Sequence, residues 1–203
     1  YTRGLSAAYF LAFGSKEAKR ISYAASIGKD HFDPEEKLVA KRYLKDLDYI
    51  SVREEKARKA VSELTDKPVE LVLDPTLLLD RQAYDKIKKK TKFKGDYIFV
   101  HNVHLTKIDS RLNSIVEKVS EMTGLPVVNN RGDYQFTNEI GKFDDGGPGE
   151  FIGVIEGAKY VITNSFHATV FSIIYGRNFI TVPHFQNPDR MKYLLQMFGL
   201  QNH

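Results

Sequence analysis

Short runs rich in β-branched and aromatic residues alternate along this chain with stretches whose apolar residues recur at helical spacing. This alternation is typical of parallel sheets, because two parallel strands need a long crossover connection, which is usually a helix. The pattern occurs twice, so the sequence predicts an α/β protein built from parallel-sheet units. The predicted strands cover residues 19–26, 49–52 and 69–73 in the first half, and residues 96–100, 125–128, 159–163 and 178–182 in the second.

Residues 33–36 (DPEE) carry the signals that start a helix. Asp33 is suited to cap the first turn, the proline fits there without losing a hydrogen bond, and the second glutamate completes a capping box. Val39, Tyr43 and Leu47 follow at helical spacing. We therefore expect these three side chains to form the face of the helix that packs on the sheet.

The two sets of strands predict two domains. Residues 1–80 would hold the C-terminal portion of the first domain, residues 81–95 would cross between the domains, and residues 96–203 would form the second domain. Residues 137–149 combine glycines with acidic residues, which predicts a mobile loop beside a cleft.

Composition excludes several classes of function. The chain has 30 basic and 26 acidic residues and a formal net charge of +4, a modest excess that does not indicate a nucleic-acid partner. It contains no cysteine, which excludes disulfides and thiolate metal sites, and no metal site is predicted. No apolar run approaches the roughly 18 to 20 residues of a membrane-spanning helix. Any membrane association would then be peripheral, and a cytoplasmic location is expected.

Ligands of open parallel sheets bind beyond the carboxyl ends of the strands, so residues that follow a strand are candidates for a site. Asn164 and Ser165 follow the predicted strand 159–163 and lead directly into a helix, whose first turn holds His167. A helix start binds phosphate or carboxylate through its N–H groups and dipole, and an imidazole there is suited to bind an anion or transfer a proton. The alternative is that Ser165 is only a helix cap and His167 a structural histidine.

Three further strand ends carry candidate residues. Arg53 follows strand 49–52 with a guanidinium that grips phosphate or carboxylate through paired bonds, the alternative being a surface ion pair with Glu54 or Asp46. Asp74, after strand 69–73, is placed to orient a basic group or to cap the next turn. His101 and Asn102 follow strand 96–100 and are candidate substrate contacts.

Several of these segments, taken in order, resemble the polysaccharide pyruvyl transferase family. The most specific is the TNSFHATVFSIIYG stretch, combined with the upstream SVRE and LDP segments, and the resemblance covers nearly the whole chain. The family often has glycine after the histidine where this chain has Ala168. The matching segments are SYAASIG (22–28), YISVREE (49–55), VLDPTLLL (72–79), GPGEFIGVIEGAKYVITNSFHATVFSIIYGRNFI (147–180) and MKYLLQMFGL (191–200).

The resemblance implies a fold and a reaction. The fold would be two Rossmann-like domains in a GT-B-like arrangement, with the N-terminal part of the first domain having no counterpart in this chain. The reaction would move the pyruvyl group of phosphoenolpyruvate onto two hydroxyls of a sugar in a bacterial surface polysaccharide or its precursor, forming a ketal. Phosphoenolpyruvate is then a donor substrate, and no cofactor is required.

The resemblance also implies roles for the candidate residues. Arg53 and the helix start from Ser165 would clamp the donor's phosphate and carboxylate, with His167 as acid/base catalyst or phosphate ligand. Asn164 and Asp74 would orient hydroxyls. A lipid-linked or nucleotide-linked acceptor would place the enzyme in the cytoplasm near the inner membrane face.

Two other functions fit the same residues. A GT-B-type glycosyltransferase would use a helix-start phosphate site equally well for a nucleotide sugar. A non-catalytic binding domain of a polysaccharide assembly system would predict that Arg53 and His167 do not share a cleft.

Overall fold

The computed structural model describes residues 5–15, 17–27, 31–103, 110–130, 134–144, 146–183 and 188–201. The chain divides into two compact units, unit 1 with residues 1–78 and 186–203 and unit 2 with residues 79–185. Every strand pair in both sheets is parallel, which confirms the predicted α/β class of Rossmann-like parallel-sheet units. This division differs from the predicted ranges 1–80, 81–95 and 96–203, because residues 79–95 belong to unit 2 and residues 186–203 to unit 1.

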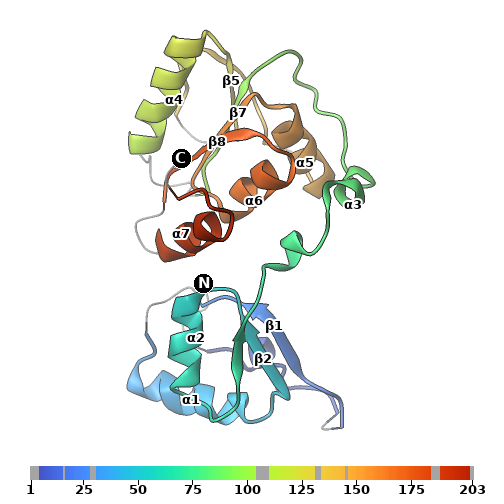
Figure 1. Cartoon of the computed structure of the whole chain (residues 1–203), viewed down its shortest axis with the longest axis vertical. Coiled ribbons are helices and arrows are strands. Elements are labelled where there is room, and N and C mark those ends of the chain that lie inside the picture. The colour runs from blue at the N-terminus through green and yellow to red at the C-terminus, as the bar shows by residue number, and fades with distance from the viewer. Residues whose placement is uncertain are drawn as a thin grey trace. The chain divides into compact units, whose positions relative to one another are not determined.

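Unit 1 contains a sheet in the order β1-β2-β3 (Figure 1). Its core packs the middle strand against α1 and α2 through buried aliphatic side chains such as Ile50, Leu44 and Val61. The elements described in this unit are η1 (Ala7–Phe10), β1 (Ile21–Ala25), α1 (Pro34–Leu44), β2 (Tyr49–Val52), α2 (Glu55–Ser62), β3 (Val69–Leu71), η2 (Pro75–Leu77) and α7 (Pro188–Met197).

The start of α1 has the predicted capping box. The Asp33 carboxylate accepts the Glu36 N–H at 2.8 Å, and the Glu36 carboxylate accepts the Asp33 N–H at 3.0 Å. The predicted packing face was wrong in part, because Val39 is 38% exposed while Ala40 and Leu44 are buried. Successive helical residues lie about 100° apart, so a face centred one residue later exposes Val39 and buries the small Ala40 against the unit.

Unit 2 contains a sheet in the order β6-β5-β4-β7-β8. Strand β6 lies in the segment predicted as a mobile loop, so that prediction was wrong. Glutamate, glycine and lysine have low strand propensity, and an edge strand of this composition gives a weak sequence signal. The elements of this unit are α3 (Arg81–Asp85), β4 (Ile98–His101), α4 (Ser110–Thr123), β5 (Val127–Asn129), β6 (Glu139–Lys142), α5 (Pro148–Gly157), β7 (Tyr160–Thr163), α6 (Phe166–Ile174) and β8 (Asn178–Thr181).

Helices cover both faces of the unit 2 sheet. Phe99 belongs to the core cluster that contains side chains of α5 and α6, and its neighbours Ile98 and Val100 belong to the cluster that contains α4. Successive side chains of a strand point to opposite faces, so the apolar run of β4 is buried on both sides. Figure 1 shows α4 apart from α5 and α6, on the other side of the strands. Among the described residues no helix is long and apolar enough to span a membrane.

Three glycines spaced four residues apart, Gly149, Gly153 and Gly157, form a stripe along α5. The chain after α3 runs along this stripe so closely that a Cβ atom on Gly153 would overlap the Lys89 carbonyl oxygen. The Lys89 N–H donates to the Gly149 carbonyl oxygen at 3.0 Å. Glycine is required where backbones approach this closely. The segment predicted as an interdomain crossing is therefore fixed to unit 2.

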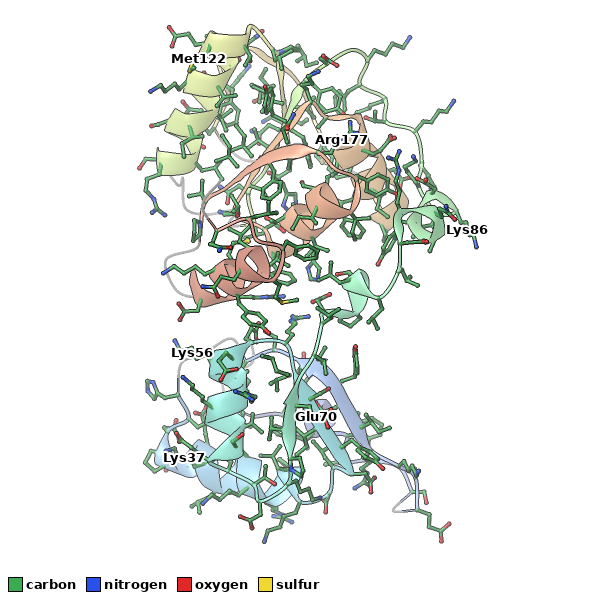
Figure 2. The ribbon with its side chains drawn as sticks, in the orientation of Figure 1. Lys37, Lys56, Glu70, Lys86, Met122 and Arg177 are labelled. Carbon is green, nitrogen blue, oxygen red and sulfur yellow. The ribbon has the colours of Figure 1, made fainter. Side chains whose placement is uncertain are left out.

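Replacing Gly153 with alanine should destabilise unit 2, because the added methyl group overlaps backbone and not a movable side chain. We expect Gly153→Ala to lower the free energy of unfolding by about 1–3 kcal/mol, as overpacking substitutions do. Met122→Ala is the control, because this α4 side chain is 75% exposed and should change stability by less than about 0.5 kcal/mol (Figure 2). Equal urea midpoints for the two variants would contradict the assigned packing.

Candidate functional site

The strand order of unit 2 contains a topological switch point. From β4 the chain proceeds outward through β5 to β6, then returns across β4 to β7 and continues to β8 in the opposite direction. Open parallel α/β sheets bind ligands outside the carboxyl ends of the strands at such a point. The residues placed there are Asn102 and Val103 after β4, and Asn164 and Ser165 after β7.

Three asparagine side chains join the ends of β4, β5 and β7. The Asn164 side chain accepts the Val103 N–H at 2.9 Å through Oδ1 and donates to Asn102 Oδ1 at 2.8 Å through Nδ2. Asn130 accepts the Asn102 N–H and donates to its carbonyl oxygen, both at 2.9 Å. We call Asn102, Asn130 and Asn164 the asparagine network. Sequence reasoning missed Asn130, although its position directly after a buried apolar strand was the available signal.

The start of α6 is held by its own polar side chains. Ser165 Oγ accepts the Ala168 N–H at 3.3 Å, which confirms that Ser165 is the helix cap. Thr163 Oγ1 accepts the Ser165 N–H at 2.9 Å, and Thr169 Oγ1 donates to the Ser165 carbonyl oxygen at 3.0 Å. Ala168 is fully buried, so its methyl group fits inside the fold at the helix start.

His167 lies in the first turn of α6 and is exposed. Its ring lies 5.4 Å from that of Phe166, in an edge-to-face contact. The position combines an accessible imidazole with the positive end of a helix dipole. This arrangement is suited to binding an anion or transferring a proton next to one.

His101 contributes to the strand ends mainly through its backbone. Its carbonyl oxygen accepts from Thr163 Oγ1 and from the Asn164 N–H. Its ring lies 5.0 Å from Phe151 and 6.0 Å from Phe99. Strand alternation explains this placement, because residues 99 and 101 point to the same face of the sheet. A substrate contact by the His101 side chain stays a prediction.

In unit 1, Arg53 forms its main ion pair with Asp74. Arg53 Nη1 donates to Asp74 Oδ2 at 2.6 Å, and the Arg53 and Asp74 side chains are only 19% and 2% exposed. Asp74 Oδ1 accepts the N–H and the hydroxyl of Thr76, at 3.0 and 2.6 Å. Asp74 therefore both orients a basic group and caps the next turn. Glu54 lies farther from Arg53, with Oε1 3.8 Å from Nε.

The predicted site residues fall into two groups in the two units. Arg53 and Asp74 lie together at the end of the unit 1 sheet, and the asparagine network lies with Ser165 and His167 at the end of the unit 2 sheet. Among the described residues no group of three or more histidine, aspartate or glutamate side chains is placed to hold a metal ion. The binding and catalytic roles of these residues stay predictions.

The fold places this chain in a class of protein, the α/β proteins built from parallel-sheet units, in which polar residues and a helix start follow the strands. A family model described as polysaccharide pyruvyl transferase matches residues 1–186, so the chain belongs to this family and is a transferase. No curated protein and no solved structure matches the chain. Family membership therefore favours pyruvyl transfer over the glycosyltransferase and the non-catalytic binding domain.

Removing the Asn164 side chain should loosen the strand ends that it joins. Asn164→Ala leaves the Val103 N–H and the Asn102 amide without these partners, so we expect unfolding free energy to fall by about 1–3 kcal/mol. Asn138→Ala, which changes an exposed asparagine of the same unit, should have little effect. Thermal unfolding of both variants measures the difference. Equal stabilities would show that the asparagine network does not support unit 2.

Proposed function

We propose that this protein transfers the pyruvyl group of phosphoenolpyruvate onto two hydroxyls of one sugar in a bacterial surface polysaccharide or its precursor. The products are a cyclic ketal and phosphate. The observation that carries the proposal is the capped start of α6 at the switch point of unit 2, in a chain of the polysaccharide pyruvyl transferase family. The Arg53–Asp74 pair of unit 1 supports it, because an oriented guanidinium is suited to bind the phosphate or carboxylate of phosphoenolpyruvate.

The reaction requires one proton transfer at carbon and the loss of one phosphate. An acid protonates the methylene carbon of the donor, which becomes the methyl group of the product. The first sugar hydroxyl adds to the adjacent carbon, and the bond from that carbon to the phosphate oxygen then breaks. The second hydroxyl closes the ring. Of the two hydroxyl protons, one replaces the proton given to the methyl group and the other leaves on phosphate.

Fixed positive potential is the main demand of this donor, which carries about three negative charges. The α6 start supplies dipoles that are already oriented by the Ser165 cap, and Arg53 supplies a guanidinium oriented by Asp74. Preorganised groups of this kind stabilise charge without having to reorient during the reaction. We assign phosphate and carboxylate binding to Arg53 and to the α6 start, with no cofactor and no metal.

His167 is assigned as the acid/base catalyst, because its exposed imidazole lies in the first turn of α6. Asp74 and Asn164 are assigned to positioning. The Asp74 carboxylate is occupied by Arg53 and Thr76, and the Asn164 amide by Asn102 and Val103. Because both side chains already bond to protein groups, we assign them to positioning those groups and not to direct contact with a sugar hydroxyl.

The proposal extends to the acceptor and its location. A sugar attached to a lipid or a nucleotide carrier is the expected acceptor, and the expected location is the cytoplasm, at the inner membrane face when the carrier is a lipid. His101, the last residue of β4, and Asn102, the residue after it, are assigned to acceptor contact, since they flank the same switch point as the α6 start.

Phosphoenolpyruvate binding should depend on Arg53. We expect isothermal titration calorimetry to detect binding by the wild-type protein and a roughly tenfold to hundredfold weaker affinity for Arg53→Gln, the range for a lost charge-assisted hydrogen bond. His31→Ala is a control at an exposed residue of unit 1 and should bind normally. Binding of a uridine diphosphate sugar in place of phosphoenolpyruvate would support the glycosyltransferase alternative instead.

Turnover should depend on His167 more than affinity does. General acid/base catalysis contributes about 10²-fold to 10⁴-fold, so His167→Ala should lower kcat at least about 100-fold. Its affinity for phosphoenolpyruvate should stay within a few-fold of wild type if the imidazole moves a proton. Loss of affinity with a normal kcat at saturation would make His167 a phosphate ligand, and normal values of both would remove it from the mechanism.

A further inference from the structure

The C-terminal helix α7 belongs to unit 1, although it lies beyond residues 1–186, the segment that the family model matches. Its Met191 and Leu194 side chains are buried, which anchors the helix. On the same helix, Arg190 Nε lies 3.2 Å from Glu54 Oε1, and Asp189 lies 3.9 Å from Lys56 Nζ. Two ion pairs thus connect α7 to the start of α2, which follows Arg53 and the strand β2.

Glu54 is a buried carboxylate between two arginines. Its side chain is 7% exposed, and its Oε1 lies 3.2 Å from Arg190 Nε and 3.8 Å from Arg53 Nε. Because both distances end on one atom, the two guanidinium Nε atoms lie at most 7.0 Å apart. One carboxylate therefore lies next to two arginines, Arg53 directly after β2 and Arg190 of α7.

The residue that follows β1 contacts the Glu54 carboxylate. The Ser26 hydroxyl donates to Glu54 Oε1 at 2.6 Å. Just before Ser26, β1 has a bulge at which Ala24 adopts a φ of +51°, a conformation that is uncommon for alanine. Bulges commonly re-aim a side chain next to a functional site. The bulge thus lies directly before the residue that holds the carboxylate.

Stability alone does not explain this arrangement. Glu54 occupies the cap position of α2 but makes no capping hydrogen bond, and among the described residues its buried Oε2 has no hydrogen-bond partner. Burying a carboxylate is costly, and replacing buried ion pairs by apolar residues is often neutral or stabilising. Local rules are broken in this way most often at functional sites.

The ion pairs border a small pocket of about 40 Å³, whose lining includes Glu54, Lys56, Arg190 and Tyr193. Lys56 lies at the start of α2 (Figure 2). Arg190 Nε lies 3.2 Å from Glu54 Oε1, and the Arg190 side chain as a whole is 24% exposed. A guanidinium oriented on one edge is preorganised to bind a phosphate or carboxylate on another.

We propose that Glu54 is a positioning residue and that Arg190, which it holds, is a second guanidinium of the donor-binding site that includes Arg53. This inference rests on the proposed function, because the ligand it assigns to Arg190 is phosphoenolpyruvate. A donor with about three negative charges requires more than one cationic partner, and the α7 arginine supplies one from outside the matched segment. Sequence comparison with the family model would not have found it.

The test is calorimetric titration of phosphoenolpyruvate into the full protein and four variants. We expect Arg190→Gln to weaken binding roughly tenfold to hundredfold. Glu54→Gln should weaken binding nearly as much. The double variant should lose no more affinity than the single variant with the larger loss, because the two residues act as a unit. Lys192→Gln removes an exposed charge from the same helix and should bind as wild type does.

A purely structural role is separated by chemical rescue. Millimolar guanidinium should restore part of the affinity of Arg190→Ala but not that of Glu54→Gln, whose arginine is still present. If Arg190→Gln fails to fold, Arg190→Lys is titrated in its place. Lysine keeps the positive charge but lacks the planar guanidinium, so this variant should bind phosphoenolpyruvate less tightly than wild type does.

The outcomes separate the two proposals. If the wild-type protein binds phosphoenolpyruvate and Arg190→Gln binds it equally well, this inference is overturned and pyruvyl transfer is left intact. The same holds for Arg190→Lys where Arg190→Gln does not fold. Binding that is weakened in Arg190→Ala but not rescued by guanidinium would also overturn it. Failure of the wild-type protein to bind phosphoenolpyruvate would overturn both.

Discussion

The hydrogen bonds of the asparagine network hold the carboxyl end of the unit 2 sheet in place. A parallel sheet leaves backbone N–H and C=O groups without ladder partners where its strands end, and buried groups of this kind must be paired. Asn102, Asn130 and Asn164 supply those partners between neighbouring strand ends. The chain after β4 and the turn into α6 are fixed by the same bonds. The preorganised start of α6 therefore depends on them.

The two units orient their polar groups by different means. Unit 2 uses neutral amides, beside which the helix dipole of α6 supplies positive potential. Unit 1 uses ions, with Arg53 between Asp74 and Glu54 and with Arg190 on the far side of Glu54. Ions cost more to bury than amides, but they hold guanidinium groups in fixed directions. Each unit thereby has an oriented group at the carboxyl end of its own sheet.

The glycine stripe of α5 is a packing feature with a consequence for the chain's organisation. Gly149 and Gly153 leave room for the backbone of residues 87–91, and Gly157 leaves room for the Tyr97 hydroxyl, which donates to the Val154 carbonyl oxygen at 2.8 Å. Burial raises the pKa of Tyr97 to about 12, so this hydroxyl remains a donor across the physiological range. The segment after α3 is thus part of unit 2.

The sequence by itself determined the α/β class, every strand that carries a candidate residue, the capped starts of α1 and α6, and the positions of Arg53 and His167. These follow from local rules, since strand alternation, helix capping and strand-to-helix junctions involve residues close together in the chain. Only the tertiary structure decided that Asp74 is the partner of Arg53, that Asn130 joins Asn102, and that Arg190 returns to Glu54. It also showed the strand β6 and the buried face of α1. These depend on contacts between residues tens of positions apart, which no local pattern encodes.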